Sequence, residues 1–154
     1  MNNKGSFSPL GRKAFLFYIE RYFVLWYNDG KKGGAIMKEN LLIDKSIAFA
    51  SRIIKLNQYL IKTKKETIIS KQIVRSGTSI GANINEANYG QSKADFVSKM
   101  HIALKETAET EYWLRLLTMS EYITEDMGKS LLDDCLDIKR ILIASINTAK
   151  ENTK

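Results

Sequence analysis

The sequence predicts an all-α fold, an antiparallel up-down-up-down four-helix bundle that follows an N-terminal extension. Three observations support this prediction. From residue 37 onward, apolar side chains recur at helical spacing in four successive segments. Only short links separate these segments, which favours antiparallel neighbours. The 154 residues include a single proline, and no stretch alternates in polarity over the length that a strand needs.

Residues 1–36 differ in composition from the rest of the chain and form the predicted extension. An aromatic-rich run at 14–27 is too short to span a bilayer. One interpretation is a translated leader with Met37 as the natural start, because Lys-Gly-Gly at 32–34 is what a purine-rich ribosome-binding sequence encodes. The alternative is an amphipathic helix that packs on the bundle or on a membrane surface. The bundle domain is predicted to be 37–154.

The first helix is predicted over residues 41–63 and carries two neighbouring apolar stripes. The first stripe consists of Ile43, Ile47, Ala50, Ile54 and Ile61. The second stripe consists of Phe49, Ile53, Leu56 and Leu60. Together they cover about half of the helix circumference, which is wider than one buried seam requires. We therefore expect one face to line the core and another to contact a neighbouring subunit.

Three further helices are predicted, each with an apolar line and a local end signal. The second opens at Glu66–Thr67 and runs to about Asn88, with Gly90 as its stop. The third spans about 93–122 with Ser92 as N-cap. The fourth spans about 125–150 with Thr124 as N-cap and acidic residues in its first turn.

A polar strip of about 80° runs beside the apolar line of the second helix. It consists of Arg75, Ser79, Asn83 and Glu86. One interpretation makes it a ligand or nucleic-acid site. The other makes it a structural polar network facing glutamates of the third helix, namely Glu106, Glu109 or Glu111. The mixed charges favour the network, because a phosphate site would not place Glu86 among its donors.

The net charge of +7 is unevenly distributed along the chain. Residues 37–75 hold nine basic and three acidic side chains, whereas residues 76–154 hold nine basic and twelve acidic ones. The candidate phosphate contacts in the basic part are Arg52, Lys55, Lys62, Lys64, Lys65 and Lys71. A charge run is often only a solvated face, but a ring of subunits would repeat the patch. No base-reading motif accompanies it, so shape and phosphate contacts would dominate binding.

The sequence offers little for catalysis, and we predict a protein that is not an enzyme and holds no cofactor or metal. His101 is the only histidine, so the Glu-x-x-His repeats of a di-metal bundle are missing. The only cysteine, Cys135, lies in the apolar line of the fourth helix, where a buried, inert thiol is the usual outcome. A single thiol fits a reducing compartment, and we expect a cytoplasmic location with no membrane association.

Three sequence blocks carry a family resemblance. They are Arg75–Ala87 (RSGTSIGANINEA), then Ser92, Asp95, Phe96 and Lys99, and then Ile102–Glu106 with Glu109, Thr110 and Tyr112–Leu117. In this order the blocks resemble the bacterial four helix bundle proteins, also called 23S rRNA intervening-sequence proteins. Many members read Asn-Ile-Ala-Glu-Gly where this chain has Asn83–Ala87, which looks like a sub-branch.

The resemblance implies a homo-oligomer, a five-fold ring (homopentamer), with a basic surface and no known catalytic activity. A related branch serves diversity-generating retroelements as accessory proteins that engage nucleic acid. The sequence therefore predicts a non-enzymatic homo-oligomer with a cationic surface for RNA or DNA. The alternative is a protein–protein adaptor or scaffold that docks a partner on the wide face of the first helix or on Tyr112 and Trp113.

Overall fold

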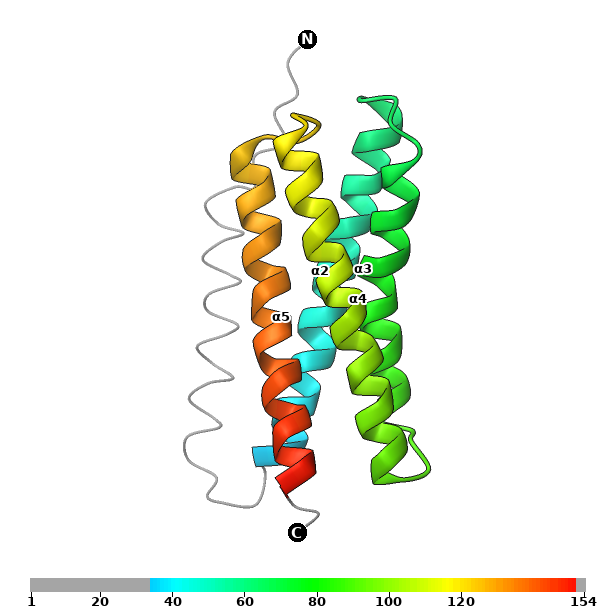
Figure 1. The fold of residues 1–154 in the computed structure, drawn as a ribbon, viewed down its shortest axis with the longest axis vertical. Helices are drawn as coiled ribbons and strands as arrows, with labels where there is room; N and C mark the ends of the chain where they lie inside the picture. Colours follow the sequence, from blue (N-terminus) through cyan, green and yellow to red (C-terminus); the bar gives the residue numbers. More distant parts are fainter. Residues whose placement is uncertain (1–33, 152–154) are drawn as a thin grey trace. The chain divides into compact units, whose positions relative to one another are not determined.

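The computed structural model describes residues 34–151, with side chains from residue 41 onward. Four helices make up most of this range: α2 (Gly34–Lys62), α3 (Ile69–Ala87), α4 (Lys93–Met119) and α5 (Glu125–Glu151) (Figure 1). No strand occurs among the described residues, and the predicted all-α bundle is confirmed. The aromatic run at 14–27, and with it the choice between leader and amphipathic helix, lies outside the described residues. The boundary after residue 36 stays a prediction.

Each helix contacts the next one along the chain, and α2 also contacts α5. Arg75 reaches Glu109 and Glu86 reaches Lys99, so residue numbers rise along α3 where they fall along α4. Glu111 of α4 pairs with Lys139 of α5. Between α2 and α5 the ion pairs are Arg52–Asp134 and Lys45–Asp137. The α2–α3 contact is close, since a Cβ on Gly77 would lie 2.9 Å from Ile53 Cγ1 and one on Gly81 would lie 3.1 Å from Ser46 Oγ.

The two apolar stripes of α2 have different surroundings. The second stripe lines the core, since Phe49, Ile53, Leu56 and Leu60 are all buried. The first stripe lies largely on the surface, where Ile47 is 62%, Ile54 43% and Ile61 40% exposed. The wide apolar surface predicted for this helix therefore consists of two parts. One part is buried in the core, and the other is exposed to solvent in the single chain. The remaining core comes from the predicted lines of α3, α4 and α5, including the buried Cys135.

Both predicted N-caps are present as expected. The Ser92 hydroxyl accepts a hydrogen bond from the Asp95 N–H at 3.1 Å, and the Thr124 hydroxyl accepts one from the Met127 N–H at 3.3 Å. The start of α3 differs from the prediction by about three residues. Glu66 and Thr67 precede the helix, because the Glu66 carboxylate accepts hydrogen bonds from the first backbone N–H groups of α3 and so acts as its cap.

The end of α4 also falls short of the predicted Tyr122. Glu121 has φ 58°, in the left-handed region. The Glu121 N–H donates to the Thr118 carbonyl at 3.0 Å and the Tyr122 N–H to the Leu117 carbonyl at 3.0 Å. This bonding is the Schellman pattern, which ends a helix and is usually built on glycine at the left-handed position. Here a glutamate occupies that position.

Candidate nucleic-acid interface

The exposed lysines of the cationic segment 53–75 form no ion pair within the described residues. Lys55 lies on α2, Lys62 is its last residue, and Lys71 lies in the first turn of α3. Lys64 and Lys65 lie on the link between the two helices. All five are exposed. Their ammonium groups are therefore open to an anionic ligand.

Arg52, the sixth candidate, has a different environment. Its guanidinium forms an ion pair with Asp134 and donates to Ser130, to the carbonyl oxygen at 3.2 Å and to the hydroxyl at 2.8 Å. These contacts join α2 to α5. The structure therefore gives Arg52 a role in helix packing and separates it from the five lysines.

Glu66 is the only acid between residues 53 and 75, and backbone groups hold its carboxylate. The carboxylate oxygens accept hydrogen bonds from the N–H groups of Ile68, Ile69 and Ser70 at 2.7–2.8 Å, and the residue is only 8% exposed. Burial alone would raise the pKa of Glu66, but these hydrogen bonds together lower it below its ordinary value. Glu66 is thus ionised at neutral pH, yet it forms no ion pair with the lysines beside it.

The link that carries Lys64 and Lys65 has a constrained backbone. Lys65 has φ 56°, and the Glu66 N–H donates to the Leu60 carbonyl at 3.0 Å. A side chain in this region costs about 1 kcal/mol relative to glycine. The fold holds the lysine there through the α2 carbonyl on one side and the Glu66 cap on the other. The link is therefore an ordered cationic turn at one end of the bundle.

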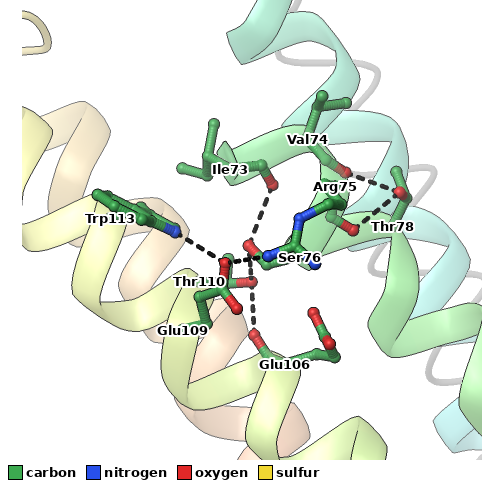
Figure 2. A network of polar contacts seen from close by, with 9 residues as sticks. All are labelled: Ile73, Val74, Arg75, Ser76, Thr78, Glu106, Glu109, Thr110 and Trp113. Atoms are coloured by element: carbon green, nitrogen blue, oxygen red, sulfur yellow. Dashed lines mark hydrogen bonds and ion pairs between the residues drawn. The ribbon is translucent and has the colours of Figure 1, made fainter. Parts of the chain in front are cut away.

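The polar strip of α3 contacts α4 at two places. Arg75 Nη2 lies 2.7 Å from Glu109 Oε1, and the same carboxylate oxygen accepts a hydrogen bond from Trp113 Nε1 at 3.2 Å (Figure 2). Glu86 pairs with Lys99 Nζ at 2.6 Å. This hydrogen bond and the Glu86 charge raise the pKa of Lys99. The ends of the strip thus make the inter-helix contacts expected of a structural network.

The middle of the strip and the other glutamates behave differently from the prediction. The Asn83 amide donates to the carbonyl of Ser79 at 2.8 Å, a bond within α3. Glu106 Oε2 is buried without a hydrogen-bond partner. Glu111 lies outside the network and pairs with Arg115 and Lys139 on the α5 side of α4. The hydrogen bonds from Lys139 and Arg115 outweigh burial and lower the pKa of Glu111.

Sequence reasoning missed a buried hydroxyl pair beneath this strip. Thr110 Oγ1 lies 2.9 Å from Ser76 Oγ and 2.8 Å from the Glu106 carbonyl oxygen, and both hydroxyl residues are fully buried (Figure 2). The signal was present, since Ser76 and Thr110 each interrupt an apolar line. Their pairing depends on how α3 and α4 align, which a single sequence does not specify.

Three further observations concern chemistry elsewhere in the described chain. Burial raises the pKa of the Cys135 thiol to about 12. In the part that the structure describes, no group of three or more His, Cys, Asp or Glu side chains could hold a metal ion. No described helix combines the length and the apolar character that a bilayer crossing needs.

These features define an all-α bundle whose helices are joined by polar contacts and whose α2–α3 segment carries lysines with no ion pair in the described part of the chain. The model of the 23S rRNA-intervening sequence protein family matches residues 38–144, and the chain belongs to this family. A crystal structure of a protein with unknown function from the S23 ribosomal protein family of Bacteroides thetaiotaomicron is 53% identical. That match covers 71% of this chain and 98% of the other, with a TM-score of 0.71. No protein with a curated description matches the chain.

Proposed function

We propose that this protein is a non-enzymatic, homo-oligomeric bundle that binds RNA or DNA in the cytoplasm through the phosphate backbone. The observation that carries the proposal is that the lysines of segment 53–75 are exposed and form no ion pair in the described chain. Lys55, Lys62, Lys64, Lys65 and Lys71 are exposed and unpaired in the described chain, and the one acid among them is bound by backbone N–H groups. By contrast, Arg52, Arg75 and Lys99 are paired within the chain.

Phosphate contacts explain this arrangement better than base reading does. Lysine is a point charge that neutralises phosphate and releases counterions, without discriminating between bases. Base readout needs side chains presented to a groove, or aromatic faces for stacking. Tyr59 is the single aromatic residue between Lys55 and Lys71, and it is partly buried against the core. Binding should therefore be strong at low salt, weak at high salt and largely independent of sequence.

RNA is the first ligand to test, because the family to which the chain belongs is named for 23S rRNA. RNA and DNA share the phosphate chemistry that the lysines recognise. RNA is therefore tested first, with duplex DNA as the comparison ligand.

Self-association belongs to the same proposal, with the five-fold ring that the family resemblance implies. The exposed isoleucines of α2 support it, because an apolar face of this extent is a contact surface more often than a solvent surface. Assembly would also repeat the lysine cluster. Several clusters on one particle raise the apparent affinity for a long polyanion without any new contact.

The test is fluorescence anisotropy with labelled RNA and duplex DNA at 50 and 200 mM salt. Changing Lys62, Lys64 and Lys65 to Gln should lower RNA affinity at low salt by at least tenfold. The matched control changes Lys105, Lys129 and Lys150 to Gln, which are exposed lysines elsewhere with no ion pair in the described chain. This control removes the same charge and should keep most of the affinity, whereas an equal loss in both variants would reject a localised site.

A second candidate function is a protein–protein adaptor. The observation in its favour is the 58% exposure of Tyr112, which makes an edge-on contact with Trp113 at a centroid distance of 4.9 Å. Aromatic side chains of this kind are typical centres of protein interfaces. If the wild-type protein retains neither RNA nor DNA at 50 mM salt, the adaptor function replaces nucleic-acid binding.

A further inference from the structure

The link between α3 and α4 carries an exposed tyrosine. Tyr89 is 80% exposed, against 58% for Tyr112. Within the described residues its hydroxyl forms no hydrogen bond and its ring contacts no other aromatic ring. The α3–α4 link lies at one end of the bundle, whereas the α2–α3 and α4–α5 links lie at the other end (Figure 1). Tyr89 and the cationic turn are therefore at opposite ends of α3.

The turn that carries Tyr89 is held in one conformation. The N–H groups of Tyr89 and Gly90 each donate to a carbonyl of the last turn of α3 at 3.0 Å. The Gln91 N–H donates to the Asp95 carboxylate at 3.2 Å. A Cβ on Gly90 would lie only 3.0 Å from the Ala87 carbonyl oxygen, so the turn is also tightly packed. An ordered turn can present the ring to a ligand without the entropy cost of ordering a loop.

The side chains around Tyr89 are of the kinds that bind single-stranded nucleic acid. Asn88 and Gln91 are exposed neutral amides, and each offers hydrogen-bond donors and an acceptor. Lys93 is exposed and forms no ion pair within the described residues. Surfaces for single-stranded RNA combine an aromatic face for a base, polar groups for its edge and a cation for the phosphate.

The acids near this turn do not neutralise Lys93. Residues 86–99 contain four charged side chains, two acidic and two basic. Glu86 pairs with Lys99 at 2.6 Å, and Asp95 accepts the hydrogen bond from the Gln91 N–H. Lys93 is therefore available for a phosphate next to the tyrosine ring.

The two ends of α3 offer different contacts to one nucleic-acid strand. The helix has 19 residues, which corresponds to a length of about 28 Å. A strand with phosphates about 3.4 Å apart covers this length with about eight nucleotides. In a duplex the base faces are stacked on one another, so an aromatic ring reaches them only where bases are unpaired. Tyr89 can thus distinguish single strands from duplexes, whereas the lysines contact phosphates in both.

We propose that Tyr89 stacks on an unpaired nucleobase, with Lys93 on a neighbouring phosphate, and that the protein prefers single-stranded nucleic acid. The inference rests on the nucleic-acid binding in the proposed function and adds a second contact and a preference for unpaired strands. Stacking tolerates every base because every base has a π-face. Binding that is largely independent of sequence is therefore retained.

The experiment measures fluorescence anisotropy at 50 mM salt with an RNA of about 12 nucleotides, longer than α3, as a single strand and as a duplex. Tyr89→Ala should lower affinity for the single strand about fivefold or more and leave duplex affinity unchanged. Tyr89→Phe keeps the aromatic face and should bind like the wild type. The matched control is Met119→Ala, which removes an 83% exposed side chain at the other end and should change neither affinity.

Two results separate this inference from the proposed function. If wild-type protein binds RNA but Tyr89→Ala binds the single strand equally well, the inference is overturned and the proposed function stands. If wild-type protein binds neither form at 50 mM salt, the proposed function fails and the inference fails with it. Circular dichroism should show wild-type helicity for every variant, since Tyr89 lies outside the core.

Two further comparisons test stacking as the cause. Single-stranded DNA of the same sequence should show the same loss with Tyr89→Ala, because stacking uses the base and not the sugar. A loss confined to RNA would contradict stacking. The slope of log K against log salt should be the same for the wild type and Tyr89→Ala, because stacking releases no counterions. A smaller slope for the variant would show a lost phosphate contact and contradict the proposal.

Photochemical crosslinking locates the contact on the chain. Single-stranded RNA that carries 5-iodouracil reacts under ultraviolet light with an aromatic ring stacked on that base. Mass spectrometry should find the crosslink at Tyr89, and it should disappear in Tyr89→Ala. A crosslink at Tyr112 with none at Tyr89 would place the base elsewhere and overturn the inference.

Discussion

The two links at the shared end of the bundle solve the same structural problem with opposite charges. The α2–α3 link has Lys65 in the left-handed conformation, and the α4–α5 link has Glu121 there. Each link ends one helix and caps the next, with Glu66 as the cap in the first and Thr124 in the second. A turn that accepts lysine in one place and glutamate in the other does not itself require either charge. The charges are therefore available for contacts outside the turn.

The two caps should differ in how much they stabilise the fold, and removing each one measures the difference. Glu66→Ala should lower the free energy of unfolding by about 2–3 kcal/mol, because three backbone N–H groups lose a buried, charged acceptor. Thr124→Ala removes one longer hydrogen bond and should cost about 1 kcal/mol. Urea unfolding measures both. Equal costs would show that the caps do not differ as the structure indicates.

The pH dependence of the Glu66 cap follows from its lowered pKa. Because the folded-state pKa lies below the unfolded value of about 4.3, the stabilisation is present above that value and is lost as the pH falls through the folded pKa. The difference in unfolding free energy between wild type and Glu66→Gln should therefore shrink on acidification from pH 7. A difference that stays constant down to pH 3 would contradict the role of the charge.

Replacing Lys65 or Glu121, the two residues in the left-handed conformation, with glycine distinguishes effects on stability from effects on RNA binding. Lys65→Gly and Glu121→Gly should each raise stability by up to about 1 kcal/mol, since glycine adopts this conformation without strain. Only Lys65→Gly should also lower RNA affinity. Thermal unfolding and anisotropy on the same samples provide the check. An equal effect of both variants on RNA binding would break the proposed distinction between the links.

The smallest expected effect concerns the polar strip. Arg75→Met should lower stability by about 0.5 kcal/mol or less, because the guanidinium side chain is 59% exposed and its Glu109 partner 32%. Chemical unfolding of Arg75→Met, Glu109→Gln and the double variant isolates the coupling. An Arg75–Glu109 interaction energy of zero would contradict the stabilising role proposed for the polar strip.

Features set by neighbouring residues were predictable from the sequence. The Ser92 and Thr124 caps were found because the cap hydroxyl and the backbone N–H that donates to it are three residues apart. The two stripes of α2 were found from their spacing, but the spacing did not say which would face the core. That choice depends on how α2 packs against α3 through Gly77 and Gly81.

Features set by the relative positions of helices were not predictable in the same way. Arg52 looks like any exposed cation in the sequence, and its pairing with Asp134 depends on the α2–α5 alignment. Glu111 is only two residues from Glu109, which rotates it to the α5 side of α4 and away from Arg75. The start of α3 was misplaced because Glu66, which looks like a first-turn residue in the sequence, precedes the helix and accepts hydrogen bonds from the N–H groups of its first turn.

The salt dependence of RNA binding measures directly whether the lysines of the α2–α3 link contact phosphate. Each phosphate contact contributes about 0.7–0.9 to the slope of log K against log salt. Changing Lys64 and Lys65 to Gln should reduce the slope by about 1.5, whereas changing Lys129 and Lys150 to Gln should leave it unchanged. Equal slopes for the wild type and the Lys64, Lys65 variant would contradict phosphate binding by this link.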